Sequence, residues 1–314
     1  ARAMLVANDC LRIVLGTFIV LVSASTEDLP LNQGSWRIGK PGVGPRFLSA
    51  AWRAESAAAV KRTMEQGQGH SHMLTDIYQF GVYTGGSLRE IRRQWMQRGL
   101  GVRAVWGLDS FEGLAPVSDV FDHKTWTPGA FSAAGAFGTS VFSEICSKIL
   151  AHIVADGDHL SADPRSDAFA KKVQFVRGFY NESLTPGLAA ARGMAPAIYV
   201  DIDVDQYVPA KQVLSWLFRE HLAVAGTFIG YDDFGSTRLW TAGESRAHEE
   251  IAAEYNVEFE HVFSPCNASS KHAYSSAPTQ KRHNCSSIPG SRCRKLTFPA
   301  LFRVVSVGRK QSLC

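Results

Sequence analysis

The chain has 314 residues, 45% of them hydrophobic and 20% charged, which are ordinary proportions for a globular protein with a sizeable buried core. The formal net charge of +4 comes from the last part of the chain, because residues 264–314 contain many Lys and Arg but no Asp or Glu. Aromatic residues are not interleaved with these charges, so a solvated basic loop is favoured over a surface for nucleic acid or anionic lipid. A nucleic-acid partner is therefore not expected.

The N-terminal part contains the apolar stretch 11–25, which is shorter than the ~20 residues that a membrane span needs. Its length suits the apolar region of a signal peptide, and the small residues Ser23, Ala24 and Ser25 follow as a cleavage site. We therefore interpret residues 1–25 as a signal peptide or a short anchor giving weak membrane association, and a helix packed on the domain is the alternative. A secretory or membrane-anchored location is favoured over a cytoplasmic one.

Residues 26–46 read as a linker rich in Gly and Pro, followed by one domain over 47–314. Within this domain, residues 264–296 form a basic insertion rich in Ser that also contains Cys266, Cys285 and Cys293. The sequence leaves open whether these cysteines pair. Since no C-x-x-C occurs, a zinc site is not expected.

Strands and helices alternate along the domain. A helix is predicted over 47–66, and its pattern fits a helix that packs against a larger part of the protein. Further helices are predicted over 88–99, 210–222 and 244–255, and strands over 76–82, 103–109, 173–179, 195–203, 226–233, 257–263 and 300–307.

This alternation predicts an α/β fold with a mostly parallel sheet of seven strands and helices on both faces. The last two strands have no helix between them, so we expect them to form a C-terminal antiparallel hairpin.

Ligands of such sheets bind beyond the carboxyl ends of the strands. The first strand is followed by "FGVYTGGS", in which Gly81 permits close approach of a ligand, Gly85 and Gly86 allow positive φ or tight packing, and Ser87 can cap a helix. A tight strand-to-helix turn explains the same residues. The second strand ends at Asp109, which suits the two hydroxyls of a ribose or, alternatively, the N-cap of a helix.

The fourth strand runs into "DIDVDQY", which places Asp201, Asp203 and Asp205 at alternate positions. An EF-hand calcium loop is excluded, because Gln206 stands where that loop needs glycine. The next strand ends with Asp232 and Asp233, so two groups of carboxylates meet at one edge of the sheet. We interpret Asp203, Asp232 and Asp233 as ligands of Mg²⁺ or a similar cation, and solvated helix caps are the alternative.

These motifs, together with "WTPGAF" (126–131) and "VQFVRGFYNESL" (173–184), occur in an order that resembles the macrocin O-methyltransferase family. The resemblance covers roughly residues 75–262 and the final strand. It implies a Rossmann-like methyltransferase fold, S-adenosylmethionine as cofactor, and methylation of sugar hydroxyls with the help of Mg²⁺.

Carried over to this chain, the resemblance implies residues for each part of the site. The methionine end of the cofactor would be lined by Gly81, Tyr83, Gly85, Gly86 and Ser87. Asp109 would hold the ribose, Ser110 and Phe111 would border the adenosine, and Asp203, Asp232 and Asp233 would hold the metal.

The chain departs from the family at Gln79, where the family usually has Glu, so a carboxylate on the ammonium side of the cofactor is missing. Gln206 stands where related catechol-type enzymes have a lysine base. Trp126 and Phe131 fit either a lid over the substrate or a hydrophobic core.

Methyl transfer to a hydroxyl also requires a proton acceptor. The candidates are an aspartate not occupied by metal, Asp201 or Asp205, or a histidine such as His123 or His248, although a lone histidine is more often structural. Asp203 is expected to be catalytic as a ligand of the activating metal ion. The expected activity is O-methylation of a small-molecule acceptor such as a glycoside. The alternatives are a metal-dependent hydrolase or hydroxylase and a non-catalytic binding module. The oligomeric state stays open, a homo-oligomer included.

Overall fold

The computed structural model describes residues 45–66, 75–116, 126–155, 164–235, 243–263 and 298–308. The interpretations of residues 1–25, of the linker up to residue 44, of the insertion 264–296 and of His123 lie outside these described residues. Among the described helices, none combines the length and the apolar character that a membrane crossing requires.

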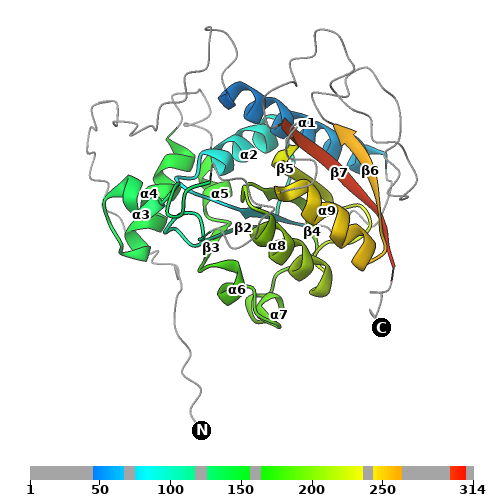
Figure 1. Ribbon diagram of the computed structural model, residues 1–314. Helices are drawn as coiled ribbons and strands as arrows, with labels where there is room; N and C mark the ends of the chain where they lie inside the picture. Colours follow the sequence, from blue (N-terminus) through cyan, green and yellow to red (C-terminus); the bar gives the residue numbers. More distant parts are fainter. Residues whose placement is uncertain are drawn as a thin grey trace, which may run out of the picture.

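The described strands form one seven-stranded sheet in the order β3-β2-β1-β4-β5-β7-β6 (Figure 1). The strands are β1 (Asp76–Phe80), β2 (Ala104–Asp109), β3 (Val173–Arg177), β4 (Ala197–Ile202), β5 (Phe228–Gly235), β6 (Val257–Phe263) and β7 (Phe298–Val307). Neighbouring strands are parallel except for β7, which lies antiparallel between β5 and β6. The predicted fold class is confirmed: a mostly parallel sheet of the Rossmann-like methyltransferase type, with a C-terminal antiparallel hairpin.

Helices cover both faces of this sheet (Figure 1). The helices are α1 (Pro45–Glu65), α2 (Gly86–Gln97), α3 (Ala133–Phe137), α4 (Phe142–Val154), α5 (Pro164–Ala170), α6 (Tyr180–Ser183), α7 (Leu188–Arg192), α8 (Tyr207–Arg219) and α9 (Gly243–Glu254). Four of them were predicted, with ends within a few residues of those observed. α3 to α7 were not.

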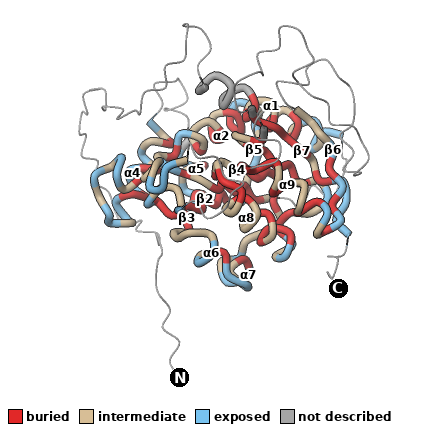
Figure 2. Tube along the Cα trace, in the orientation of Figure 1, coloured by how far each residue is buried: buried red, intermediate tan, exposed pale blue. Residues whose placement is uncertain are grey.

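The hydrophobic core lies in two layers, one on each side of the sheet. Tyr78 and Phe80 of β1 pack with α8 and α9, whereas Ile77, the residue before Tyr78, packs with α1, α2 and α4. This alternation follows from the two-residue period of a strand. Buried segments follow the strands, and exposed ones lie on the outer turns (Figure 2). The strands are therefore buried from both faces, which explains their nearly continuous apolar sequences.

Helix α1 is docked closely on the sheet. A Cβ atom added to Gly230 of β5 would lie 2.1 Å from Cζ3 of Trp52, so the indole of Trp52 needs glycine at this position. Trp52, Arg53, Ser56, Ala57 and Val60 form the buried face of the helix. The helix therefore brings one charged side chain, Arg53, to the sheet.

Candidate active site

A cavity of about 840 Å³ opens at the carboxyl ends of the central strands. Its position agrees with the rule for open α/β sheets, because the strand order reverses between β1 and β4. Its lining comes from the turns after β1 and β2, from the segment after β3, and from the ends of β4 and β5 with the start of α8. The site residues predicted from sequence that line it are Gly81, Tyr83, Gly86, Ser87, Asp109, Ser110, Asp203, Asp205, Asp232 and Asp233.

Gly81 brings the turn after β1 against the end of β4. Its φ is 83°, and a Cβ atom there would lie 1.8 Å from the carbonyl oxygen of Asp203. The N–H of Gly81 donates to the carbonyl of Leu108, and the N–H of Asp203 donates to that of Phe80. Glycine is therefore required here by the packing of two chain segments that both border the cavity.

The other two glycines of this turn have different roles. Gly86 begins α2 and lines the cavity, as expected. Gly85 has φ 86° and packs on α4, where an added Cβ atom would lie 2.8 Å from the side chain of Ile149. Tight packing of two helices, rather than contact with a ligand, is what the structure shows for Gly85.

The carboxylate of Asp109 holds two turns together. Its Oδ2 accepts the backbone N–H groups of Val82, at 2.6 Å, and Tyr83, at 2.9 Å. Its Oδ1 accepts the N–H of Phe111 at 2.6 Å. Burial raises the pKa of Asp109, and these backbone donors act in the opposite direction. Asp109 borders the cavity, and its contact with a ribose stays a prediction.

Phe111 does not border the cavity, although the resemblance implied that it would. Its backbone has φ 60°, and its ring lies fully buried against Phe142 and Phe175. The turn directs this ring into the core beneath β2. Exposed aromatic rings are found instead at the rim, where Tyr83 and Phe131 lie edge to face with centroids 5.9 Å apart. Trp126 also lines the cavity.

Gln79 lies beneath this turn and is fully buried. Its Nε2 donates to the carbonyl of Gly81 at 3.2 Å, and within the described residues its Oε1 has no hydrogen-bond partner. The side chain is not part of the cavity lining. The amide therefore supports the backbone of the turn from below, which a carboxylate at this position could not do by donation.

The three aspartates at alternate positions around the end of β4 do not share one environment. Asp201 is fully buried within the strand and does not border the cavity, whereas Asp203 and Asp205 do. The strand ends at Ile202 and Asp205 has φ 62°, so the alternation stops there. The predicted meeting with Asp232 and Asp233 is found, because Asp203, Asp205, Asp232 and Asp233, all half-buried, line one cavity.

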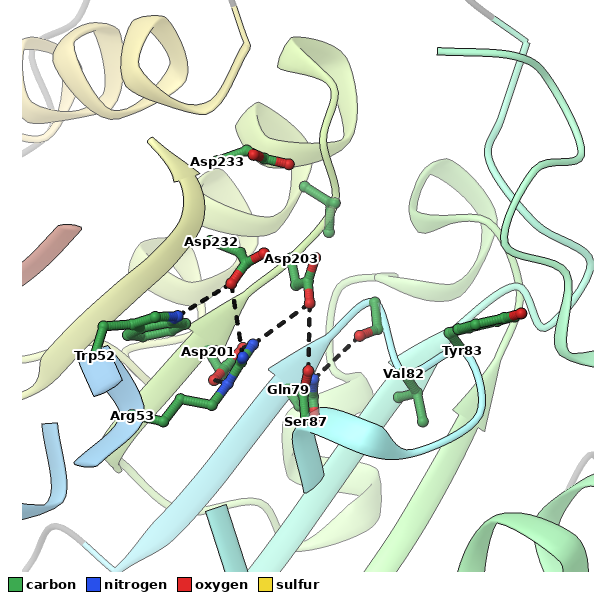
Figure 3. A network of polar contacts seen from close by, with 12 residues as sticks. Trp52, Arg53, Gln79, Val82, Tyr83, Ser87, Asp201, Asp203, Asp232 and Asp233 are labelled. Atoms are coloured by element: carbon green, nitrogen blue, oxygen red, sulfur yellow. Dashed lines mark hydrogen bonds and ion pairs between the residues drawn. The ribbon is translucent and has the colours of Figure 1, made fainter. Parts of the chain in front are cut away.

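A residue that the sequence analysis did not select, Arg53, lies among these carboxylates (Figure 3). Its Nε and Nη2 donate to the two oxygens of Asp201, at 2.8 and 3.0 Å. Nη2 is also 3.4 Å from Oδ2 of Asp203, and Nη1 is 3.6 Å from Oδ1 of Asp232. One signal in the sequence could have indicated this: Arg53 shares a helix face with Ala57 and Val60, four and seven residues on.

These contacts decide whether the site fits a divalent cation. Oxygen ligands must converge to within ~2–2.6 Å of one ion. Asp203 and Asp232 instead direct oxygens to Arg53, while Asp233 is hydrogen-bonded to Asp205. In the part of the chain that the structure describes, no group of three or more His, Cys, Asp or Glu side chains is arranged to hold a metal. The observed geometry does not support the predicted Mg²⁺ site.

Burial changes the acid–base properties of the cavity carboxylates. It raises the pKa of Asp203 well above its usual range, with Asp232 adding to the effect and Arg53 opposing it. It likewise raises the pKa of Asp205, next to Asp233. Such groups take up protons more readily than an ordinary aspartate, as a general base near neutral pH requires.

Glu244 of α9 is a second residue that the sequence analysis missed. It is fully buried, and its two oxygens accept the N–H groups of Val204, at 3.1 Å, and Asp233, at 3.2 Å. Burial and the charge of Asp233 raise its pKa well above the usual range. Glu244 thus holds together the two chain segments that carry the aspartates, and no sequence signal marks it.

His248 is not a site residue. It is 2% exposed, lies between Phe259 and Phe302 with ring centroids 4.2 and 4.4 Å away, and shares a hydrogen bond with the hydroxyl of Tyr231. Burial lowers its pKa to about 3. The candidate base His248 is therefore a neutral core residue on the helix-covered face, and the prediction is corrected accordingly.

Comparison with known proteins gives only distant likenesses. No protein-family model matches the chain, and no curated protein matches it. Among solved structures, CalS11, described as a calicheamicin methyltransferase, is 19% identical over 82% of each chain, with a TM-score of 0.49. The O-methyltransferase NovP is 14% identical over 82% of this chain and 80% of its own, with a TM-score of 0.46.

A third solved structure, the O-methyltransferase TomG from Streptomyces achromogenes in complex with SAM, is 12% identical. The match covers 82% of this chain and 90% of TomG, with a TM-score of 0.37. The fold assignment rests on the strand order of this chain itself.

Proposed function

We propose that this chain is an S-adenosylmethionine-dependent O-methyltransferase that acts on a hydroxyl of a sugar or another diol-bearing small molecule. The observation that carries the proposal is the cavity at the reversal of strand order, with a glycine turn and Asp109 on one side and the aspartates of β4 and β5 on the other. A cofactor and an acceptor can therefore meet in one cavity.

The turn after β1 is suited to the cofactor. Gly81 and Gly86 line the cavity, Gly86 has open space beside it, and Asp109 fixes both neighbouring turns through their N–H groups. Bound S-adenosylmethionine would supply a methyl group activated by its positively charged sulfur. Aspartates across the cavity favour a cation of this kind electrostatically.

The end of β4 is suited to the acceptor. Asp203, Asp205 and Gln212 offer oxygens that accept hydrogen bonds from neighbouring hydroxyls, and Trp126 offers an apolar face. Bound cofactor would supply the methyl group, and Asp203 or Asp205 would take up the proton that the acceptor hydroxyl loses, which leaves S-adenosylhomocysteine and the methyl ether as products.

Magnesium has no step in this mechanism. The predicted assistance by Mg²⁺ is not supported, because Arg53 lies where the carboxylates converge. A metal-dependent hydrolase or hydroxylase gains no support from the same geometry. A non-catalytic binding module is the other alternative. Such a module would bind ligands in the same cavity but would not catalyse methyl transfer.

Calorimetric titration with S-adenosylmethionine and with S-adenosylhomocysteine tests cofactor binding directly. We expect saturable binding of both, and absence of binding would reject the proposal. Transfer of labelled methyl groups to a panel of glycosides, inositols and catechols then separates an enzyme from a binding module. Asp203→Asn and Asp205→Asn should identify the proton acceptor, since removing a general base costs ~10²–10⁴-fold in turnover.

A further inference from the structure

Three carboxylates from two strands converge on one guanidinium from helix α1 (Figure 3). Asp201 makes a two-point ion pair with Arg53, at 2.8 and 3.0 Å. Asp203 and Asp232 lie 3.4 and 3.6 Å from its other donors. Arg53 is 1% exposed, so this is a buried cation shared by three anions.

Neutral donors complete the arrangement. The indole N–H of Trp52 donates to Oδ1 of Asp232 at 3.0 Å, the same oxygen that faces Arg53. The hydroxyl of Tyr199 donates to Oδ2 of Asp201 at 3.0 Å. The guanidinium also lies 4.5 Å from the centroid of the Trp52 ring, so the aromatic face stabilises the cation. Helix α1 therefore supplies the positive charge that compensates these carboxylates, and the guanidinium of Arg53 is held in place by contacts on several sides.

We infer that Arg53 is the resident cation of this carboxylate cluster and that it takes the place of a divalent metal ion. Helix α1 is thus a working part of the site and not only a cover on the sheet. The inference concerns metal binding and the unfolding temperature, so it stands or falls separately from the proposed methyl transfer.

Two physical reasons support mutual exclusion of Arg53 and a metal. A divalent ion needs the carboxylate oxygens within ~2–2.6 Å, yet oxygens of Asp203 and Asp232 are directed at guanidinium nitrogens. A second cation beside Arg53 would also be repelled, and this repulsion is strong where water is scarce. Arg53 is 1% exposed, and its guanidinium is held by the two-point ion pair with Asp201 and by the ring of Trp52.

The test is titration of the full chain with Mn²⁺, followed by electron paramagnetic resonance, with the unfolding temperature measured in Mg²⁺ and in chelator. Four proteins are compared: the wild type, Arg53→Lys, Arg53→Met and the control Arg62→Met. Arg62 lies on the same helix but is exposed and, among the described residues, forms an ion pair with Glu55.

We expect the wild type and Arg53→Lys to show no saturable Mn²⁺ site and no effect of chelator on the unfolding temperature. Arg53→Met leaves Asp201 buried without its partner, so its unfolding temperature should fall by roughly 10 °C. It should gain a saturable Mn²⁺ site and recover part of the loss on adding the ion. Arg62→Met should change the unfolding temperature by at most about 3 °C.

Saturable Mn²⁺ binding by the wild type that disappears in Asp203→Asn would overturn the inference, and so would binding by Arg53→Lys. A folded Arg53→Met that binds no Mn²⁺ would also overturn it, because Arg53 would then not be what keeps metal out. Should Arg53→Met not fold, the wild type and Arg53→Lys decide the question by themselves.

Discussion

The carboxylate of Asp109, at the end of β2, accepts the backbone N–H of Val82 in the turn after β1, at 2.6 Å. Through this bond and those from Tyr83 and Phe111, one buried side chain sets the shape of two turns that line the cavity. The position of the glycine turn therefore depends on a residue from the neighbouring strand.

Asp109→Asn should weaken binding of S-adenosylhomocysteine by at least about tenfold and lower the free energy of unfolding by about 1–3 kcal/mol. The amide nitrogen of Asn cannot accept a hydrogen bond, so at least one backbone N–H loses its partner. Calorimetry and urea unfolding measure the two effects. Glu112→Gln is the matched control, because Glu112 is an exposed carboxylate three residues on, paired with Arg177 at 2.7 Å. Equal effects of the two substitutions would contradict this role of Asp109.

Two glycines of the same turn should respond oppositely to alanine. Gly81→Ala should lower the free energy of unfolding by about 3 kcal/mol or more, since it adds a methyl group at positive φ and against the carbonyl of Asp203. Gly86→Ala meets no atom within 4 Å and lies in a helix, so it should stabilise the protein by about 0.5–1 kcal/mol. Urea unfolding checks both, and a stable Gly81→Ala protein would show that the turn is not as close to β4 as described.

His248 should make the protein less stable in mild acid. Burial lowers its pKa in the folded state to about 3, against ~6.5 when unfolded. Below the unfolded value the unfolded chain binds a proton that the folded chain does not. The contribution of the neutral His248 ring to the free energy of unfolding is thus complete above about pH 6.5. It is lost as the pH falls towards about 3.

For this group the expected loss between about pH 7.5 and about pH 5 is about 2 kcal/mol of unfolding free energy. His248→Phe should remove that part of the pH dependence, although Tyr231 loses its partner and the overall stability falls. The buried carboxyl groups act in the opposite direction in both proteins, so the difference between the two pH profiles isolates the histidine. Parallel profiles would mean that His248 titrates normally.

Asp76 should matter for stability but not for the cofactor. It begins β1, at the edge of the sheet opposite the cavity, and accepts hydrogen bonds from Arg103, Trp106 and the N–H of Ala195. Asp76→Asn should cost about 3 kcal/mol of unfolding free energy. Affinity for S-adenosylhomocysteine should stay within about threefold of the wild type, since the two sites share no contact. A larger loss of affinity would show that this edge is coupled to the cavity.

Much of the sheet could be predicted because its strands are apolar runs with clear ends. The predicted strand 257–263 coincides with β6, and 103–109 differs from β2 by one residue. Helix α4 was missed although Ile145, Ile149 and Ile153 recur every four residues on its buried face. This spacing is typical of the buried face of an α-helix, so the sequence itself indicates α4.

The cavity was predicted less completely, for a physical reason. The adjacent strand ends correctly indicated that Asp203 would meet Asp232, because Asp203 follows β4 and Asp232 lies near the end of β5, and these parallel strands end at one edge of the sheet. The source of the compensating charge could not be read in the same way, since Arg53 is 148 residues before Asp201 in the sequence and reaches it only through the docking of α1. His248 failed as a candidate because its helix faces the core, which a residue type alone does not reveal.

The docking of α1 also determines where this protein can be shortened. A fragment starting at β1 would keep every β-strand. It would, however, uncover Gly230 on the face of the sheet and leave the charge of Asp201 unpaired in an apolar interior. A protein fragment expressed for crystallisation or for directed evolution should therefore begin upstream of Pro45, even though the recognisable motifs start thirty residues later.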